Sequence, residues 1–409
     1  MQISVPDSSH AAGASPARPG PPPWGEDPGA TIVGLAAAIA ARSRGAPVEL
    51  SHRSLAPAIA EARHLVLLLL DGFGERQLAT LAPGGALAAS RVGGLRSVFP
   101  TSTAPAITSF ASAVFPAAHA NPGWLCWSPQ HAAAIRSLPM DVRGAPGQAV
   151  EAASLWDWRS ASLDSRMPVI ALQPQAIAES EFSTHAWAGA QRVGYRSADE
   201  LVETIDSAVR SHPDGAWLWV YLPHFDSTSH ERGWQSDAAV AVAVRFDRLF
   251  ERLVARLGDS DALLLATADH GFIDVPPPQR LDLADFPTLS ALLERPLCGE
   301  PRVAYCQPLP GAELAFEAAV RAQLGFAFES FRTAELIAAG WFGPGPVSPR
   351  LAARVGSHVL VGRDHYTLVD QVEGEKPPKF IGMHGGIHPD EIAVPLIAAR
   401  RGAPLPSVA

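Results

Sequence analysis

The sequence predicts an α/β fold built on a doubly wound, mostly parallel central sheet with helices on both faces. Apolar runs that end in polar residues occur at 65–71, 217–226 and 262–270, and a fourth run covers 391–399. Such runs are typical of strands that are buried on both faces of a parallel sheet. Helical patterns separate the runs, and this alternation is typical of doubly wound folds.

Helices are expected where an alanine-rich or amphipathic stretch separates two of these runs. The first expected helix, at 31–44, is followed by Gly45, a residue type that commonly ends helices. The other expected helices cover residues 55–62, 104–113, 198–210 and 238–257.

The pattern divides the chain into a tail, a catalytic domain and a cap. Residues 1–30 are rich in proline, glycine and alanine and are expected to form a disordered or loosely attached tail. The catalytic domain is expected at 31–275 and 376–409. An inserted α+β cap is expected at 276–375, where prolines are frequent. Within the cap we expect a βαβ-like stretch, another helix and a hairpin, at 301–325, 333–339 and 358–370.

Composition argues against several classes of function. The 409 residues include 32 Lys and Arg against 41 Asp and Glu, so the formal net charge is −9. This net negative charge disfavours electrostatic binding of nucleic acid or of an anionic membrane over a broad surface of the protein. No apolar run reaches membrane-spanning length, no secretory signal is recognisable, and the three cysteines form no CxxC pair. We therefore expect a cytoplasmic protein that binds neither a nucleic-acid polymer nor a membrane.

Chemically active side chains follow the predicted strands, at the sheet edge where open α/β proteins bind ligands. Each signal is weak alone, because each also fits a turn, a helix cap or a loop. Together they form a set of carboxylates, imidazoles and hydroxyls: Asp71, Thr101 to Thr103, Asp226, His230, Asp269, His270 and His384.

This set of side chains suits divalent metal ions. Nitrogen and oxygen ligands favour Zn²⁺, with Mn²⁺ as an alternative. Two such ions about 4 Å apart could hold both the attacking and the leaving oxygen of an in-line displacement. Neighbouring side chains of an extended strand point to opposite sides, so Asp269 and His270 could each serve a different ion.

The order of these motifs resembles the alkaline phosphatase superfamily, most closely its type I phosphodiesterase/nucleotide pyrophosphatase branch, over roughly residues 63 to 400. The family's Pro-Thr-x-Thr motif stands here at 100–103, so the resemblance implies that Thr103 is the nucleophile. It also implies two divalent metal ions. One would be bound by Asp226, His230 and His384, and the other by Asp71, Asp269 and His270 with Thr103.

The resemblance implies a double in-line displacement through a phospho-threonine intermediate. The expected substrate is a small phosphoester, with a nucleotide-like phosphodiester or pyrophosphate bond that the enzyme hydrolyses. The resemblance also implies an alkaline phosphatase-like central domain and a cap between the Asp-His-Gly motif and His384.

The sequence departs from the family where phosphate is bound. Diesterase members carry Pro-Asn after the nucleophile motif and a further Asn that binds a phosphate oxygen. Here Ala106 follows Pro105, and Trp124 stands where the second Asn is expected. We expect Asn121, from a shifted loop, and Trp124, as a stacking wall, to contact the substrate. A core or cap-contact position for Trp124 is an equally good interpretation.

These departures leave alternatives open. A phosphomonoesterase or phosphonate hydrolase would keep the same site, and Arg302 or Lys379 could supply the positive charge that a monoester needs. A catalytically silent metal-binding protein would require the loss of a ligand or of the nucleophile, and none is missing. A sulfatase and a mutase are disfavoured by the Thr at position 103.

Four other histidines lie close to these motifs or in the cap. We expect His119 to be structural. His224 and His388 are candidates for orienting a metal ligand, and His365 is a candidate for reaching the substrate from the cap.

Overall fold

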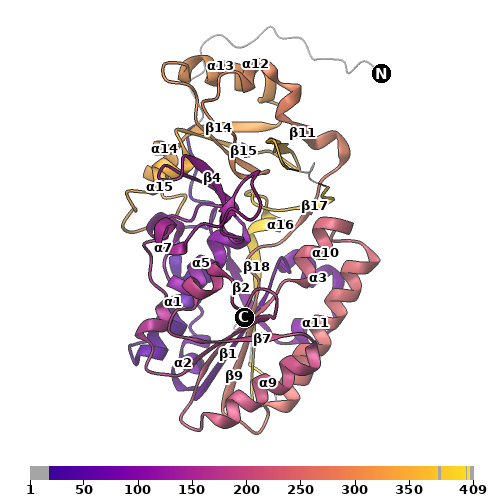
Figure 1. The fold of residues 1–409 in the computed structure, drawn as a ribbon. Helices are drawn as coiled ribbons and strands as arrows, with labels where there is room; N and C mark the ends of the chain where they lie inside the picture. The colour runs from indigo at the N-terminus through magenta and orange to yellow at the C-terminus, as the bar shows by residue number, and fades with distance from the viewer. Residues whose placement is uncertain (1–17, 376–378, 402, 406–409) are drawn as a thin grey trace.

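The computed structural model describes residues 18–375, 379–401 and 403–405, and Figure 1 shows their fold. The central sheet has the strand order β19–β18–β9–β1–β8–β6–β7, with β2 paired to β18. Strands β9, β1, β8, β6 and β7 are parallel, and β18 joins β9 in an antiparallel pair. The strands are β1 (His64–Leu70), β2 (Arg91–Arg96), β6 (Val169–Pro174), β7 (Gln191–Tyr195), β8 (Trp217–Leu222), β9 (Ala262–Thr267), β18 (Ala393–Arg400) and β19 (Ala403–Pro404).

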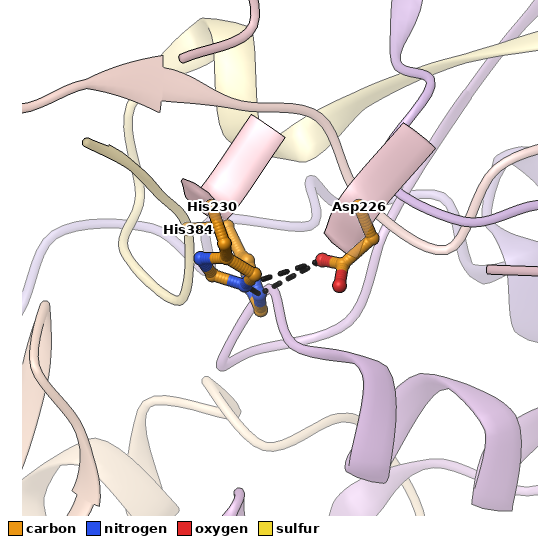
Figure 2. Close-up of side chains that lie close together, drawn as sticks. All are labelled: Asp226, His230 and His384. Carbon is orange, nitrogen blue, oxygen red and sulfur yellow. Dashed lines mark hydrogen bonds and ion pairs between the residues drawn. The ribbon is translucent and has the colours of Figure 1, made fainter. Parts of the chain in front are cut away.

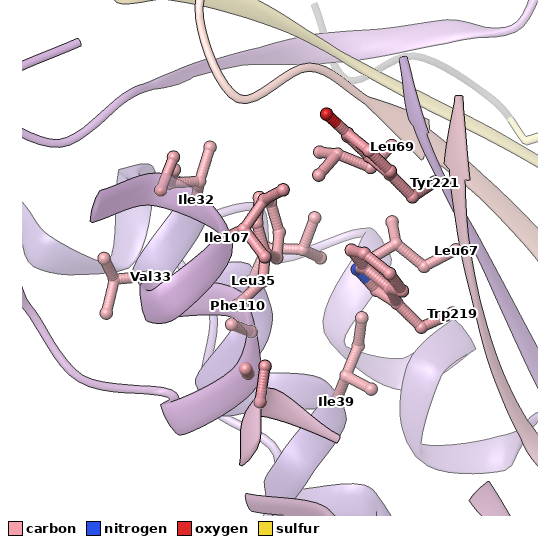
Figure 3. Close-up of a cluster of buried hydrophobic side chains, with 14 of the residues drawn as sticks. Ile32, Val33, Leu35, Ile39, Leu67, Leu69, Ile107, Phe110, Trp219 and Tyr221 are labelled. Carbon is pink, nitrogen blue, oxygen red and sulfur yellow. The ribbon is translucent and has the colours of Figure 1, made fainter. Parts of the chain in front are cut away.

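Helices cover both faces of this sheet, which confirms the predicted fold class. Alternate residues of β1 enter two different hydrophobic clusters: Leu67 and Leu69 belong to one, and Leu68 and Leu70 to the other. Figure 3 shows the first cluster, in which Leu67 and Leu69 of β1 pack with side chains of helices α1 (Ile32–Arg44) and α5 (Thr103–Ser112). Helices α9 (Ala198–Ser211) and α11 (Asp237–Arg256) contribute to the second cluster.

The expected helices lie within one residue of the predicted boundaries at each end. Local chemistry explains two of these ends. The Thr31 hydroxyl accepts a hydrogen bond from the Gly34 N–H at the start of α1. At its other end Gly45 adopts the left-handed conformation (φ 71°) that glycine tolerates best.

A second sheet lies against the carboxyl-end side of the central sheet, in the upper part of Figure 1. Its order is β14–β15–β13–β12–β3–β4–β5, and all of its neighbouring strands are antiparallel. The strands are β3 (Leu125–Ser128), β4 (Ala133–Arg136), β5 (Asp141–Val142), β12 (Cys298–Glu300), β13 (Val303–Cys306), β14 (Phe328–Arg332) and β15 (His358–Gly362). Strands β3 to β5 precede the predicted insert in the chain, so residues 276–375 supply only part of this sheet.

The expected βαβ-like stretch and hairpin have different outcomes. Helix α13 (Glu313–Leu324) connects β13 to β14, and both strands flank β15, so the stretch forms a split βαβ unit. The predicted hairpin at 358–370 is wrong. Strand β16 (Thr367–Val369) pairs with β11 (Arg280–Asp282), a segment nearly ninety residues earlier in the chain, rather than with β15.

The beginning of the described chain is attached to the molecule. Trp24 is buried and its indole N–H donates to the Gly340 carbonyl at 2.9 Å. The Trp341 indole in turn donates to the Gly20 carbonyl at 3.0 Å. The expectation of a loose tail is therefore wrong for residues 18–30, and residues 1–17 lie outside the described residues.

The remaining elements are short, apart from a nine-residue helix, α10, that begins just after β8. None of the described helices is long and apolar enough to cross a membrane. These elements are α2 (Leu55–Glu61), α3 (Glu75–Leu81), α4 (Ala86–Ala89), α6 (Pro116–His119), α7 (Ala152–Leu155), α8 (Glu181–Ala186), α10 (His224–Arg232), α12 (Pro287–Ser290), α14 (Thr333–Ala338), α15 (Leu351–Val355), α16 (Pro389–Ile392), β10 (Ile273–Asp274), β17 (Gly382–Met383) and the 3₁₀ turns at 28–30, 161–164, 277–279 and 283–285.

Truncation of Leu67 should destabilise the fold. This side chain is 1% exposed in the central strand, so Leu67→Ala leaves a cavity that costs about 2–5 kcal/mol. The matched control, Leu314→Ala, alters a leucine that is 73% exposed and should change stability by less than about 0.5 kcal/mol. Urea unfolding followed by circular dichroism measures both, and equal losses would contradict the assigned core.

Candidate active site

The candidate site lies where three adjacent parallel strands end. Strand β1 pairs with β8 on one side and with β9 on the other, so their carboxyl ends meet at one edge of the sheet. Asp71 follows β1, Asp226 lies in α10 just after β8, and Asp269 follows β9. The sheet therefore gathers three carboxylates that are far apart in the chain.

Asp71, Asp269 and His270 form one buried cluster, with ligand-type atoms within 4.8 Å of one another. The His270 Nε2 atom lies 3.4 Å from Asp71 Oδ1 and 3.6 Å from Asp269 Oδ2. Asp269 Oδ1 accepts a hydrogen bond from the Gly72 N–H at 3.0 Å, whereas Asp269 Oδ2 has no hydrogen-bond partner among the described residues. A buried carboxylate oxygen without a donor is the kind of atom that a cation would satisfy.

This cluster corrects the expectation that Asp269 and His270 serve different ions. Both side chains lie in the same group with Asp71. The alternation argument does not apply because β9 ends at Thr267, so the two residues follow the strand instead of lying within it.

Asp226, His230 and His384 form a second cluster, shown in Figure 2. Asp226 and His230 are four residues apart on α10, so they share one face of that helix, and His384 comes from the loop after β17. The Asp226 Oδ1 atom lies 3.3 Å from His230 Nε2 and 3.5 Å from His384 Nε2. The structure thus forms two ligand clusters, and their membership is the one that the family resemblance implies.

The three imidazoles of these clusters are oriented in the same way. In each ring Nδ1 faces a backbone carbonyl: Gly382 for His230 at 3.0 Å, Thr101 for His384 at 2.9 Å, and Gly271 for His270 at 3.0 Å. An Nδ1–H that donates to a carbonyl leaves Nε2 as a free lone pair. This second hydrogen bond is characteristic of metal-binding histidines.

The site is electrostatically crowded. Burial, together with the nearby Asp269 and Asp226, raises the pKa of Asp71 well above its usual range. Burial also lowers the pKa of His384 well below its usual value, and His270 and His230 lower it further. Although burial opposes it, His230 holds the pKa of Asp226 below its ordinary range. Divalent cations would relieve the repulsion between these carboxylates, so the residues fit metal binding.

Thr103 lies against the first cluster, at the start of α5. Its hydroxyl oxygen is 3.1 Å from His270 Nε2 and 3.5 Å from Asp71 Oδ1. The other carboxylate oxygen of Asp71 accepts a hydrogen bond from the Tyr221 hydroxyl, which fixes the orientation of that carboxylate. Thr101 points away from the cluster, because its hydroxyl donates to the Gly386 carbonyl at 2.8 Å.

Glu391 positions parts of both clusters and was not predicted. Its carboxylate accepts hydrogen bonds from the Gly386 and His388 N–H groups, at 2.9 and 3.1 Å, and so fixes the loop that carries His384. Its backbone carbonyl accepts the N–H of Gly271, next to His270, at 2.7 Å. No sequence signal distinguishes this residue, because it stands at the beginning of an apolar run like any strand-flanking Glu.

Arg302 is buried in an ion pair, which does not favour it as the cation that was suggested for a monoester. Its guanidinium is 1% exposed and pairs with Glu391 at 2.9 Å. It also donates to the Tyr366 carbonyl at 2.7 Å. The other suggested cation, Lys379, is exposed.

The two expected substrate contacts are placed differently. Asn121 is fully buried, and its amide NH₂ donates to Thr108 Oγ1 at 2.9 Å, so this group faces α5 rather than either cluster. The geometry therefore does not favour Asn121 as a phosphate ligand. Trp124 is 37% exposed and lines a cavity of about 470 Å³ together with Glu300. The Trp124 N–H donates to Glu300 Oε1 at 2.6 Å.

The additional histidines have structural environments. His119 is buried, with Nε2 3.0 Å from the Ser109 hydroxyl, as expected for a structural residue. His224 is exposed, and His388 is the N-cap of α16. His365 Nδ1 bonds the Asp274 carbonyl at 2.7 Å. Among the described residues, the side chains of these last three form no hydrogen bond to a member of either cluster.

Comparison with known proteins identifies the family. The family model for type I phosphodiesterase / nucleotide pyrophosphatase matches residues 65–387. The chain belongs to this family. No curated protein sequence matches it significantly. Membership in the type I phosphodiesterase/nucleotide pyrophosphatase family confirms the resemblance and supports phosphodiester hydrolysis as the class of reaction. The family is metal-dependent, which agrees with the two ligand clusters.

Solved structures show the same fold at low sequence identity. Mouse ectonucleotide pyrophosphatase/phosphodiesterase 5, as an inactive variant in complex with AMP, has a TM-score of 0.62 and 16% identity, covering 83% of this chain and 88% of that chain. Its human counterpart has a TM-score of 0.62 and 14% identity, covering 85% and 91%. These similarities confirm the alkaline phosphatase-like fold of this family member.

Protonation of His119 should destabilise the fold below neutral pH. Burial lowers its folded-state pKa to about 3, against about 6.5 when unfolded, so the unfolded chain takes up the proton first. This contribution is fully present above pH 6.5 and is lost at about 1.4 kcal/mol per pH unit below it. Urea unfolding between about pH 7.5 and 5.5 should show a shallower loss for His119→Gln than for the wild type. The exposed control His131→Gln should retain the wild-type slope, and a wild-type slope for His119→Gln would contradict the prediction.

Proposed function

We propose that this protein is a two-metal hydrolase that cleaves phosphodiester or pyrophosphate bonds of nucleotide-like substrates through a phospho-threonine intermediate. The observation that carries the proposal is the position of Thr103. Its hydroxyl lies 3.1 Å from His270 Nε2 at the edge of a buried acidic cluster, and the second cluster adjoins it, because the His270 and His384 rings stack 3.6 Å apart.

The chain offers two sets of metal ligands. Asp71, Asp269 and His270 would bind one divalent ion, with Thr103 at its edge, and Asp226, His230 and His384 would bind the other. Zn²⁺ is our choice for this nitrogen and oxygen donor set, with Mn²⁺ as the alternative. Bound there, the ions would supply Lewis acidity for the attacking and leaving oxygens.

The proposed reaction is a double displacement. The Thr103 hydroxyl gives up its proton to water and attacks phosphorus, and the phosphoryl group is held as a threonine ester. The bond to the leaving group breaks, and the leaving oxygen takes up a proton from water. Water then attacks this ester from the side of Asp226, His230 and His384, which releases the phosphoryl product and restores the Thr103 hydroxyl. The N-terminus of α5 lies at Thr103, where its N–H groups and dipole favour a negatively charged phosphoryl group.

The structural neighbours support the nucleophile and the substrate class. The mouse neighbour bound to AMP is a threonine-to-alanine variant described as inactive, and AMP is a nucleotide product of the kind proposed here. The cavity beside Trp124 is of the size that ligand pockets commonly have, and its described lining includes Glu300 but no member of either cluster. We keep Trp124 as the proposed contact for the nucleotide-like portion. Cytoplasmic location and the absence of a nucleic-acid polymer or membrane partner stay predictions.

Replacement of the nucleophile should abolish turnover. In Zn²⁺-loaded protein, Thr103→Ala should lower kcat for bis-p-nitrophenyl phosphate by at least about a thousandfold, because the covalent route is lost. The control Ser112→Ala removes a hydroxyl from the far end of the same helix and should remain near wild type. p-Nitrophenyl phosphate, assayed in parallel, reports monoester hydrolysis.

The outcomes separate the alternatives. A diester preference that depends on Thr103 supports the proposal, whereas a monoester preference would favour the phosphomonoesterase. If neither substrate shows Thr103-dependent turnover, the proposal fails for these esters. A phosphonate substrate would then separate a phosphonate hydrolase from a catalytically silent metal-binding protein.

Metal content should follow the two clusters. After dialysis against Zn²⁺, we expect about two equivalents per wild-type chain and about one in His384→Ala, which removes a ligand of the second cluster. His131→Ala, an exposed histidine outside both clusters, is the control and should keep the wild-type content. Atomic emission spectrometry measures the ratio, and equal metal content in His384→Ala and wild type would refute the assignment.

A further inference from the structure

Glu300 is a buried carboxylate beside the candidate site that the proposed mechanism does not use. It ends β12 and is 5% exposed. Its Oε1 atom accepts the Trp124 N–H at 2.6 Å, and the Ser102 side chain is near enough to lower the pKa of this carboxyl. Ser102 immediately precedes Thr103, so the carboxylate lies beside the backbone that positions the nucleophile.

Three functional segments surround this carboxylate. Besides Ser102, the loop after His384 approaches so closely that a Cβ on Gly385 would lie 2.8 Å from the Glu300 Cβ. A Cβ on Gly123, next to Trp124, would lie 3.2 Å from Glu300 Oε1. Glycine at these positions lets the backbone pack closely against Glu300, so its side chain lies beside the loop that carries His384 and near His230 and Asp226 of the second cluster.

The charge of Glu300 has no salt-bridge partner among the described residues. Arg302, two residues further along, pairs with Glu391 instead. His230 is near enough to affect Glu300, but its Nε2 atom pairs with Asp226 at 3.3 Å. Burial raises the pKa of Glu300 to about 7, so the carboxylate is mostly ionised at alkaline pH.

We propose that Glu300 makes this site selective for phosphoryl groups with one ionised oxygen, as in a diester, over the dianionic group of a monoester. The inference rests on the proposed function and deepens it. A fixed negative charge in a low-dielectric site repels a dianionic phosphoryl group about twice as strongly as a monoanionic one at the same distance. Selectivity obtained by repelling the competitor is a common device in binding sites. Glu300 would thus favour diesters in a chain whose Asn121 amide faces α5 rather than either cluster.

The test removes the charge and keeps the shape. Glu300→Gln retains an oxygen that can accept the Trp124 N–H. We expect the ratio of kcat/KM for bis-p-nitrophenyl phosphate to that for p-nitrophenyl phosphate to fall at least about tenfold, mainly through faster monoester hydrolysis. Glu300→Asp keeps the charge and should retain most of the wild-type selectivity. Glu294→Gln, at an exposed position six residues earlier, is the charge-matched control and should leave the ratio unchanged.

A second readout does not need turnover. Calorimetry on the Zn²⁺-loaded proteins at one alkaline pH compares inorganic phosphate, a dianion there, with dimethyl phosphate, a monoanion. Glu300→Gln should bind inorganic phosphate about tenfold more tightly relative to dimethyl phosphate than the wild type does. A structural role alone would weaken both ligands and would not change their relative affinity.

The outcomes distinguish this inference from the proposed function. An unchanged substrate ratio and unchanged relative affinity in folded Glu300→Gln would overturn the role of Glu300, even if Thr103-dependent hydrolysis stands. If the wild type shows no Thr103-dependent turnover, the proposed function fails, and the calorimetric comparison still decides the role of Glu300. Should Glu300→Gln fail to fold, loss of selectivity in folded Glu300→Asp would likewise overturn the inference.

Discussion

The buried Arg302–Glu391 ion pair joins the second sheet to the loop that carries His384. Burying two charges is costly, and such a pair is tolerated only when further hydrogen bonds satisfy both partners. Here the Tyr366 carbonyl accepts from the guanidinium, and the Gly386 N–H donates to the carboxylate. Because the Glu391 backbone also holds the segment after His270, one residue fixes parts of both ligand clusters.

Backbone hydrogen bonds also keep the candidate metal-binding side chains oriented, although many charged groups lie close together in the site. Each of the three imidazoles is held by a backbone carbonyl at Nδ1, so its orientation does not depend on a neighbouring carboxylate. The carboxylates remain close to one another because the strands that carry them are adjacent in the sheet. The chain thus folds with these carboxylates already close together. Divalent cations would relieve the repulsion between them.

Much of this could be predicted from the sequence, because the decisive signals are local. Strands β1, β8 and β9 are continuous apolar runs, and the side chains after them belong to ordered motifs. The second sheet could not be predicted in full, because β3 to β5 have only two to four residues each and join the rest of the sheet through the pairing of β3 with β12, more than 150 residues later. The roles of Arg302, Glu391 and Glu300 depend on tertiary contacts with distant residues, which no local pattern encodes. The burial of Trp24 was not predicted, because the composition of the surrounding segment indicates disorder. A single aromatic residue attaches this segment to the rest of the molecule.

Glu300, which belongs to the second sheet, enters the balance of charges at the candidate active site. Asp71, Asp226 and Asp269 carry three negative charges when ionised, and the two proposed divalent cations would carry four positive ones. While Thr103 keeps its proton, the site without Glu300 would have one surplus positive charge, which would favour additional charge on the phosphoryl group. With Glu300 ionised the formal charges cancel, and each further negative charge on the substrate meets a neutral site instead of an attractive one. Since Glu300 belongs to β12, the second sheet would contribute to substrate choice through one buried carboxylate in the role proposed for it.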